Sequence, residues 1–314
     1  AQMFTRFGLE QAPRPLPSLL LGAVDLPPID VAQLYNGLAN GGFHVPLRAV
    51  RAVIDERGER IGTAQLGEAA LAKLRKLKAD KLPLVRGKPR FGCPVAGVGK
   101  FVAIGLNFAD HAKEAGLEPP PEPIFFTKAI SCLNGPNDDV MIPKDALKTD
   151  WEVELGVVIG KRARYVEQSE ALDYVAGYVL VNDVSERAFQ KELGSQWDKG
   201  KGCDTFGPVG PWLVTADEVG DCQNLDMWLD LNGKRMQTGN TRTMIFGVAE
   251  LIAYMSRFVT LEPGDILTTG TPPGVGEGQK PEKIFLKPGD VMALGIEKLG
   301  SQRQTVIAWT KEGV

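Results

Sequence analysis

The sequence predicts an α+β protein that is mainly β, with a smaller N-terminal α/β domain ahead of a larger domain built from short strands. From residue 101 onward, short apolar runs alternate with Gly and Pro while helical patterns are few, which is typical of sheets that pack on or roll over one another. A connector punctuated by Gly and Pro, "LPLVRGKPRFGCPVAGVGK", ends the first part of the chain. We therefore expect two domains, residues 1–98 and 99–314.

Composition limits the partners of the protein. The net charge of -3 comes with no basic stripe, which argues against nucleic acid and anionic membranes as partners. The apolar runs are too short to cross a bilayer, and no charged-then-apolar leader opens the chain. The four cysteines are widely spaced without a Cys-x-x-Cys pair, which favours reduced thiols over a zinc site or a disulfide scaffold. We expect a soluble, cytoplasmic protein.

Histidine is scarce, and this restricts the possible chemistry. Only His44 and His111 are present, so a histidine-rich transition-metal site is excluded and any metal needs oxygen ligands. His44, in the Gly-rich stretch "NGGFHVPL", is interpreted as a structural or surface residue.

The segment "GLNFADHAKEAGLEPPPEP", residues 105–123, predicts a short helix over about 108–115, with Asn107 as N-cap and Gly116 as C-cap. His111 and Glu114 are spaced i, i+3 on it and can face one another. A glutamate that holds one imidazole nitrogen raises the basicity of the other, so the pair could activate a water. A surface helix with an incidental His and Glu is the alternative.

A strand predicted at residues 150–160, "DWEVELGVVIG", carries Glu152, Glu154 and Gly156 on one face and apolar side chains on the other. Two neighbouring carboxylates repel one another unless a cation lies between them or water solvates both. A solvated face of an antiparallel sheet is therefore one interpretation, and a metal site is the other.

A second strand, "GYVLVNDVSER", is apolar until it ends in Asn182 and Asp183. Neither strand segment supplies an evident basic partner, so Glu152, Glu154 and Asp183 together are suited to a hard dication such as Mg²⁺, with Mn²⁺ or Ca²⁺ as alternatives. Gly156 is expected to leave room beside this site. Asp183 could instead cap the turn at Ser185.

Three further segments complete the analysis. A helix is predicted from about 246 to 258, with an apolar stripe assigned to the core. "LEPGDIL" and "LKPGDVM" predict type II turns that lead into strands. The loop "TTGTPPGVGEG", residues 268–278, lacks the Gly-Lys-Ser/Thr ending of a phosphate loop; it either offers backbone N–H groups to an anion or is a plain turn.

Taken together, the chain closely resembles the fumarylacetoacetate hydrolase family. The resemblance rests on seven segments in family order between Gly105 and Gly276: "GLNFADHAKE", "PIFFTKAISCLNGPND", "DWEVELGVVIG", "GYVLVNDVSER", "KGCDTFGPVGPWLV", "GNTRTMIF" and "LEPGDILTTGTPPGVG". It implies a mixed β-sandwich roll as the catalytic domain, a Mg²⁺ or Mn²⁺ site, a small 2-oxo or 2,4-diketo acid as substrate, and a homodimer.

The resemblance also implies roles for individual residues. Glu152, Glu154 and Asp183 match the metal ligands of the family, and His111 with Glu114 matches the pair that activates water in its hydrolases. Substrate-binding positions of the family are matched by three residues: Gln190, Lys201 and Thr271. Lys201 and Gln190 would hold the substrate's carbonyl oxygens and stabilise the charge that develops there, and Thr271 would lie at its carboxylate.

The expected reaction is the hydrolysis of a C–C bond in an acylpyruvate, with a diketo-deoxy sugar acid as one plausible substrate class. The family also contains 2-oxo acid decarboxylases, isomerases, hydratases and ureidoglycolate lyases, which reuse the same metal-enolate chemistry and remain alternatives. A catalytically inactive metal-binding or scaffold protein is an alternative of another class.

Overall fold

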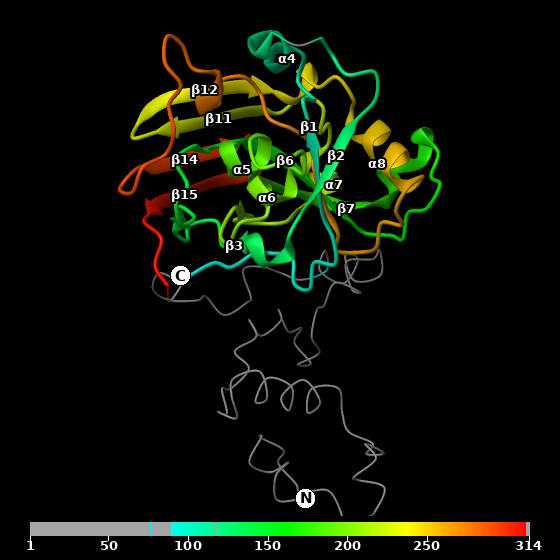
Figure 1. Ribbon diagram of the computed structural model, residues 1–314. Helices are drawn as coiled ribbons and strands as arrows, with labels where there is room; N and C mark the ends of the chain where they lie inside the picture. Colours follow the sequence, from blue (N-terminus) through cyan, green and yellow to red (C-terminus); the bar gives the residue numbers. More distant parts are fainter. Residues whose placement is uncertain (1–75, 77–88, 117, 312–314) are drawn as a thin grey trace, which may run out of the picture. The chain divides into compact units, whose positions relative to one another are not determined.

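The computed structural model of the protein describes residues 76, 89–116 and 118–311 (Figure 1). Most of the predicted N-terminal domain, including His44, lies outside the described residues. The described part is built mainly from strands, as predicted, and its strands form two larger sheets and two short two-stranded ones.

The larger sheet has six strands, and its order differs from the order of the chain. Its strands, from one edge to the other, are β10 (Val214–Thr215), β7 (Val175–Asn182), β6 (Val153–Ile159), β13 (Ile266–Thr268), β1 (Phe101–Gly105) and β2 (Ile124–Lys128). Neighbours are antiparallel except β1 and β13, which run parallel with Phe101 opposite Ile266. This mixed pairing brings the ends of β1, β6, β7 and β13 into one region.

The second sheet has five strands and lies on the left of Figure 1. Its strands, in order, are β12 (Lys234–Asn240), β11 (Asp226–Leu231), β14 (Val291–Ile296), β15 (Gly300–Ile307) and β4 (Val140–Met141). The two short sheets pair β3 (Leu133–Asn134) with β9 (Gly207–Pro208) and β5 (Thr149–Asp150) with β8 (Ser185–Glu186).

The two larger sheets share one core. Strands β11 and β14 contact β6, while β14 and β15 contact β7, and every residue of β6 is buried. Amide side chains join the sheets where polar groups meet this core: Gln302 donates to the carbonyl of Leu180 (2.8 Å), and Asn182 donates to Gln304 (3.2 Å). Such bonds keep buried polar groups paired, which a packed interior requires.

The helices are short and lie around the sheets. They are α4 (Ala109–Ala115), α5 (Arg187–Lys191), α6 (Asp198–Lys201), α7 (Ala216–Val219) and α8 (Val248–Ser256), with 3₁₀ turns η4 (Ile130–Cys132), η5 (Gln168–Tyr174), η6 (Thr241–Thr243) and η7 (Gly276–Gly278). The apolar stripe of α8 is buried as predicted, and this helix packs against η5. No helix among the described residues is long and apolar enough to span a membrane.

Local predictions near the turns are mostly confirmed. Gly116 closes α4 in the left-handed conformation (φ 69°). In "LEPGDIL", the amide of Asp265 donates to the carbonyl of Glu262 and Gly264 has φ 88°, which is a type II turn. All four cysteines are free thiols.

Two local predictions are wrong. Asn107 does not cap α4: its side chain bonds to the backbone of Phe246 and Thr269 and so ties the start of the helix to the sheet region. Gly156 does not make room for a ligand, because a Cβ there would lie 2.7 Å from methyl groups of Val179 and Val181. The side chains of Val179 and Val181 on the neighbouring strand β7 fill the space that a side chain at this position would need.

Candidate active site

The residues singled out in the sequence gather around one cavity of about 610 Å³. The predicted residues that line it are His111, Glu114, Glu152, Glu154, Gln190, Lys201 and Thr271. Asp183, the remaining one, is fully buried, and its carboxylate lies against those of Glu152 and Glu154. The cavity therefore joins the end of β6, the helices α4 to α6 and the loop after β13.

The three acids form a buried cluster. One oxygen from each of Glu152, Glu154 and Asp183 lies within 4.8 Å of the others, and the three residues are 5%, 1% and 0% exposed. A solvated strand face is therefore excluded. Asp183 does not cap the turn either, because the hydroxyl of Ser185 donates to its backbone carbonyl while its carboxylate points into the cluster.

Cations partner two of these acids, and one of these cations, Arg187, lies within "GYVLVNDVSER", so the prediction that neither strand segment supplies a basic partner is wrong. Nζ of Lys201 lies 2.5 Å from Glu152 Oε2 and 2.7 Å from Asp183 Oδ2. Nζ of Lys128 lies 2.5 Å from the other oxygen of Asp183. Burial alone would lower the pKa of Lys201, but the charges of Asp183 and Glu152 outweigh it and raise that pKa, so Lys201 stays cationic.

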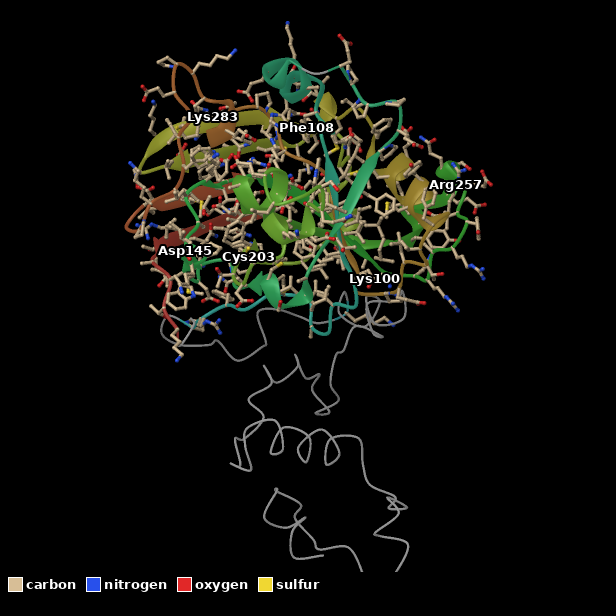
Figure 2. All side chains as sticks on the ribbon, in the orientation of Figure 1. Lys100, Phe108, Asp145, Cys203, Arg257 and Lys283 are labelled. Atoms are coloured by element: carbon tan, nitrogen blue, oxygen red, sulfur yellow. The ribbon has the colours of Figure 1, made fainter. Side chains whose placement is uncertain are left out.

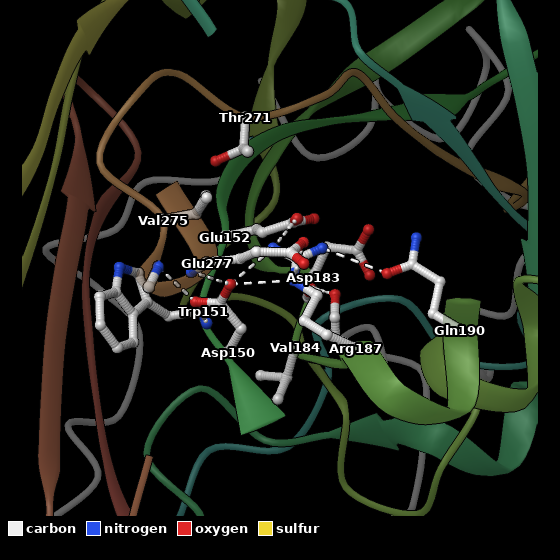
Figure 3. Close-up of polar contacts among 12 residues, drawn as sticks. Asp150, Trp151, Glu152, Asp183, Val184, Arg187, Gln190, Thr271, Val275 and Glu277 are labelled. Atoms are coloured by element: carbon white, nitrogen blue, oxygen red, sulfur yellow. Dashed lines mark hydrogen bonds and ion pairs between the residues drawn. The ribbon is translucent and has the colours of Figure 1, made fainter. Parts of the chain in front are cut away.

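Arg187 holds the second oxygen of Glu152, at 2.6 Å (Figure 3). Its guanidinium also donates to Asp150 Oδ2 through Nε (2.9 Å), with Nη2 2.8 Å from the same oxygen as an ion pair, and through Nη1 to the amide oxygen of Gln190 (3.3 Å). Burial alone would raise the pKa of Glu152, but the charges of Arg187 and Lys201 outweigh it and hold that pKa far below its usual range. Arg187 thus fixes the orientation of both a predicted metal ligand and a predicted substrate-binding amide.

Glu154 differs from its two neighbours because its hydrogen-bond donors are uncharged. Its Oε2 accepts from the hydroxyl of Thr268 and from the amide of Gly270 (2.9 Å). Burial, followed by the charges of Asp183 and Glu152, raises its pKa well above the usual value. The three carboxylates form a buried, all-oxygen cluster in which the negative charges repel one another. This is the donor set that Mg²⁺ and Mn²⁺ prefer, so the residues fit a hard dication.

His111 and Glu114 lie together on α4, at the top of Figure 1. Nδ1 of His111 is 3.2 Å from Oε2 of Glu114, whose carboxylate also accepts from the amide of Gly274 (3.2 Å). Burial alone would raise the pKa of Glu114, but the bonds from His111 and Gly274 outweigh it and lower that pKa. With Nδ1 engaged by a carboxylate, Nε2 is the nitrogen left to accept a proton.

The helix is also fixed at its base. Phe108, at the foot of α4 (Figure 2), is fully buried and forms a β-bridge with Met244. Together with the side chain of Asn107, this anchors the base of the helix that carries His111 and Glu114; the role of the pair stays a prediction.

The Gly-rich loop at residues 268–278 does offer amides to anions, but the anions are the protein's own carboxylates. Besides the amides of Gly270 on Glu154 and Gly274 on Glu114, those of Gly276 and Glu277 donate to Asp150 at 2.6 and 2.9 Å. The loop is therefore a scaffold for side chains of the site.

The predicted substrate-binding residues differ in what they can offer. The oxygen of Gln190 accepts from Arg187, so its NH₂ group is the end available to a substrate oxygen. The hydroxyl of Thr271 donates to the carbonyl of Val153 (2.9 Å) and accepts from Gln237 (2.8 Å). Thr271 lines the cavity, and a role at the substrate's carboxylate stays a prediction.

Comparison with known proteins agrees with this arrangement. The family model described as fumarylacetoacetate (FAA) hydrolase, C-terminal, matches residues 100–307. The chain belongs to the fumarylacetoacetate hydrolase family. The resemblance inferred from the seven segments is thereby confirmed.

Relatives within the fumarylacetoacetate hydrolase family cover most of the chain. It is 65% identical over 244 residues, 78% of this chain and 86% of the other, to 2,4-didehydro-3-deoxy-L-rhamnonate hydrolase of Sphingomonas sp. (strain SKA58). A fumarylacetoacetate hydrolase from psychrophilic Exiguobacterium antarcticum shares 36% identity with a TM-score of 0.69, over 74% of this chain and 84% of that one. The Pseudomonas aeruginosa fumarylpyruvate hydrolase, in complex with Mn²⁺ and pyruvate, shares 28% identity and a TM-score of 0.62, over 73% and 100% of the two chains.

Sequence reasoning missed several polar residues of this family site. Arg187 follows Asp183 by four residues and ends the segment "GYVLVNDVSER", so a basic residue close to a buried acid was an available signal. Asp150 stands in the same segment as Glu152 but was not singled out. Lys128 lies 55 residues from the aspartate that it contacts, and no local pattern indicates that pairing.

Proposed function

We propose that the chain is a metal-dependent hydrolase that cleaves the bond between C3 and C4 of a 2,4-diketo-3-deoxy sugar acid. Support comes from membership of the hydrolase family and from the 65% identity to a Sphingomonas enzyme named for such a substrate. The observation that carries the proposal is that the His111–Glu114 pair lines the same cavity as the carboxylates of Glu152 and Glu154.

The residues that would hold the metal are Glu152, Glu154 and Asp183. A dication bound there supplies Lewis-acid stabilisation of the negative charge that develops on the 2-oxo acid end of the substrate. Mg²⁺ is the ion we propose, with Mn²⁺ or Ca²⁺ able to use the same ligands.

The side chains of the protein supply the remaining steps. Nε2 of His111, oriented through Nδ1 by Glu114, accepts a proton from a water that attacks the C4 carbonyl. Lys201 and the NH₂ of Gln190 donate hydrogen bonds to oxygens on which negative charge grows. The C3–C4 bond then breaks and its electron pair stays with C3. The proton that His111 accepted from water is returned to C3, directly or through solvent, which completes pyruvate. The acyl carbon leaves as a carboxylic acid.

A product analysis in labelled water tests the proposal. Purified protein with Mg²⁺ is given 2,4-didehydro-3-deoxy-L-rhamnonate, acetylpyruvate, oxaloacetate and ureidoglycolate in H₂¹⁸O. Hydrolysis is expected to give pyruvate, with one ¹⁸O atom in the carboxylate of the acyl product. Carbon dioxide from oxaloacetate without cleavage of either diketo acid would instead identify a decarboxylase of the same family. Turnover of ureidoglycolate alone would identify a lyase.

A homodimer in the cytoplasm is part of the same proposal, by analogy with the family. Sedimentation equilibrium of the purified protein checks the dimer. A single species with the mass of one chain would contradict it.

A further inference from the structure

A chain of contacts crosses the cavity from a cationic side to an aromatic side. On the cationic side, Glu277 is surrounded by Lys191 (2.5 Å), Lys283 (3.3 Å) and Arg187 (3.7 Å). Burial alone would raise the pKa of Glu277, but these cations outweigh it and lower that pKa. Each of these cations is paired with a carboxylate of the protein, so this side of the cavity is lined by charged, hydrogen-bonding groups.

Glu152 marks the middle of the chain of contacts, since Arg187 holds one of its oxygens and Lys201 the other. On the far side of Lys201 the charged side chains give way to aromatic ones. Nζ of Lys201 lies over the ring of Phe126, 5.1 Å from its centroid, and the rings of Phe126 and Trp197 are 5.4 Å apart. The reacting centre therefore lies between a charged side and a hydrocarbon side.

Trp197 lies on the hydrocarbon side and packs at the end of β1. It directly precedes α6, and its carbonyl accepts from the amide of Lys201 (3.1 Å), so the indole and the lysine belong to one helical turn. Its ring lies against Gly105 at the end of β1, where a Cβ would be only 2.5 Å from Cζ3. Both Trp197 and Gly105 line the cavity, beside Ile104 and Leu106.

We propose that Trp197 is a specificity-determining residue, whose ring forms the wall of the subsite for the acyl group that hydrolysis releases. The inference rests on the proposed function, because the 2-oxo acid end of a diketo acid goes to the metal held by Glu152, Glu154 and Asp183, and its acyl end is left to the hydrocarbon side. With the indole seated on Gly105, the wall limits this subsite to short acyl groups. An aromatic wall selects acyl groups by size, because each additional methylene of the acyl group either fits beside the ring or clashes with it and so changes the binding of the transition state.

The test is kcat/KM for acylpyruvates of increasing length, from acetyl to octanoyl. Trp197→Ala is expected to raise the octanoyl-to-acetyl ratio of kcat/KM by about 10-fold or more, the scale of discrimination in a hydrophobic pocket. Trp197→Phe, which keeps an aromatic ring, is expected to give an intermediate shift. Trp309→Ala is the matched control, because that indole lies outside the cavity, and the ratio should not change.

A double-mutant cycle tests whether Trp197 limits the length of the acyl group or only stabilises the fold. Gly105→Ala places a Cβ 2.5 Å from the present position of the indole ring, so the ring must shift, and the octanoyl-to-acetyl ratio is expected to change when Trp197 is present. In the Trp197→Ala background the same change should have no effect on the ratio. An unchanged ratio in Trp197→Ala, equal losses for all acyl groups, or a Gly105→Ala effect that persists without the indole would overturn the inference.

The experiment also separates this inference from the proposed function. If wild type cleaves acylpyruvates but Trp197→Ala keeps the same length preference, only the inference fails. If wild type with Mg²⁺ cleaves neither an acylpyruvate nor a diketo sugar acid, both fail.

Discussion

Replacing Arg187 with methionine should destabilise the protein strongly, because Arg187 pairs two carboxylates that have little access to water. The side chains of Arg187, Asp150 and Glu152 are 6%, 0% and 7% exposed. Removing one partner of a buried ion pair typically costs about 3–5 kcal/mol, because the charge left behind is uncompensated. At roughly 2–4 °C per kcal/mol for a domain of this size, Tm should fall by on the order of 10 °C.

The assay is thermal and urea unfolding in EDTA, so that metal does not mask the loss. Arg162→Met is the matched control: Arg162 pairs with Glu262 at 3.2 Å, but the two side chains are 67% and 46% exposed. Exposed pairs contribute only about 0–1 kcal/mol. If Arg187→Met were no more destabilising than Arg162→Met, the reasoning about the buried pairs would be refuted.

Three further predictions concern catalysis, metal binding and pH. His111→Ala should lower kcat by about 10²–10⁴ with unchanged Mg²⁺ affinity by calorimetry; undiminished hydrolysis would refute the assigned base. Because burial and its acidic neighbours raise the pKa of Glu154, Mg²⁺ binding at a pH below that raised pKa should release a proton. The release is seen as a buffer-dependent binding enthalpy that Glu154→Gln abolishes. Identical heats in all buffers would contradict this. The pKa of Glu277 is lowered from 4.5 in the folded state, so its contribution to stability is present above that pH and is lost as pH falls through the lowered value. The difference in urea stability between wild type and Glu277→Gln should therefore vanish in acid, and a difference independent of pH would argue against the ion pairs.

The sequence predicted the elements whose pattern is local. The apolar runs of β6 and β7, the stripe of α8 and the Gly116 end of α4 follow from alternation, periodicity and turn chemistry. Strand β12 was missed because its residues are largely polar, although Asn232 and Gly233, at φ 52° and 80°, give the Asn-Gly hairpin signal that leads into it.

The carboxylates of the site were predictable and most of their partners were not. Glu152 and Glu154 draw attention because acids are costly in a buried strand. Their partners come from elements that adjoin them only after the sheet has formed, as Lys128 on β2 does for Asp183 on the end of β7. Position along the chain carries no information about such a contact. The pairing of these acids with cations could therefore be identified only from the structure.

The Gly-rich loop after β13 makes three parts of the site dependent on one short stretch of backbone. Gly270 bonds to an acid at the floor of the cavity, Gly274 to the acid that orients His111, and Gly276 to the acid that anchors Arg187. A change of backbone path in this loop would disturb the hydrogen bonds to all three carboxylates at once. A loop substitution that moves the backbone is therefore expected to affect more than one of these carboxylates. The wall that we propose for Trp197 shares none of these bonds. A substitution of Trp197 therefore leaves the three bonds from this loop to the carboxylates in place, whereas a substitution within the loop does not.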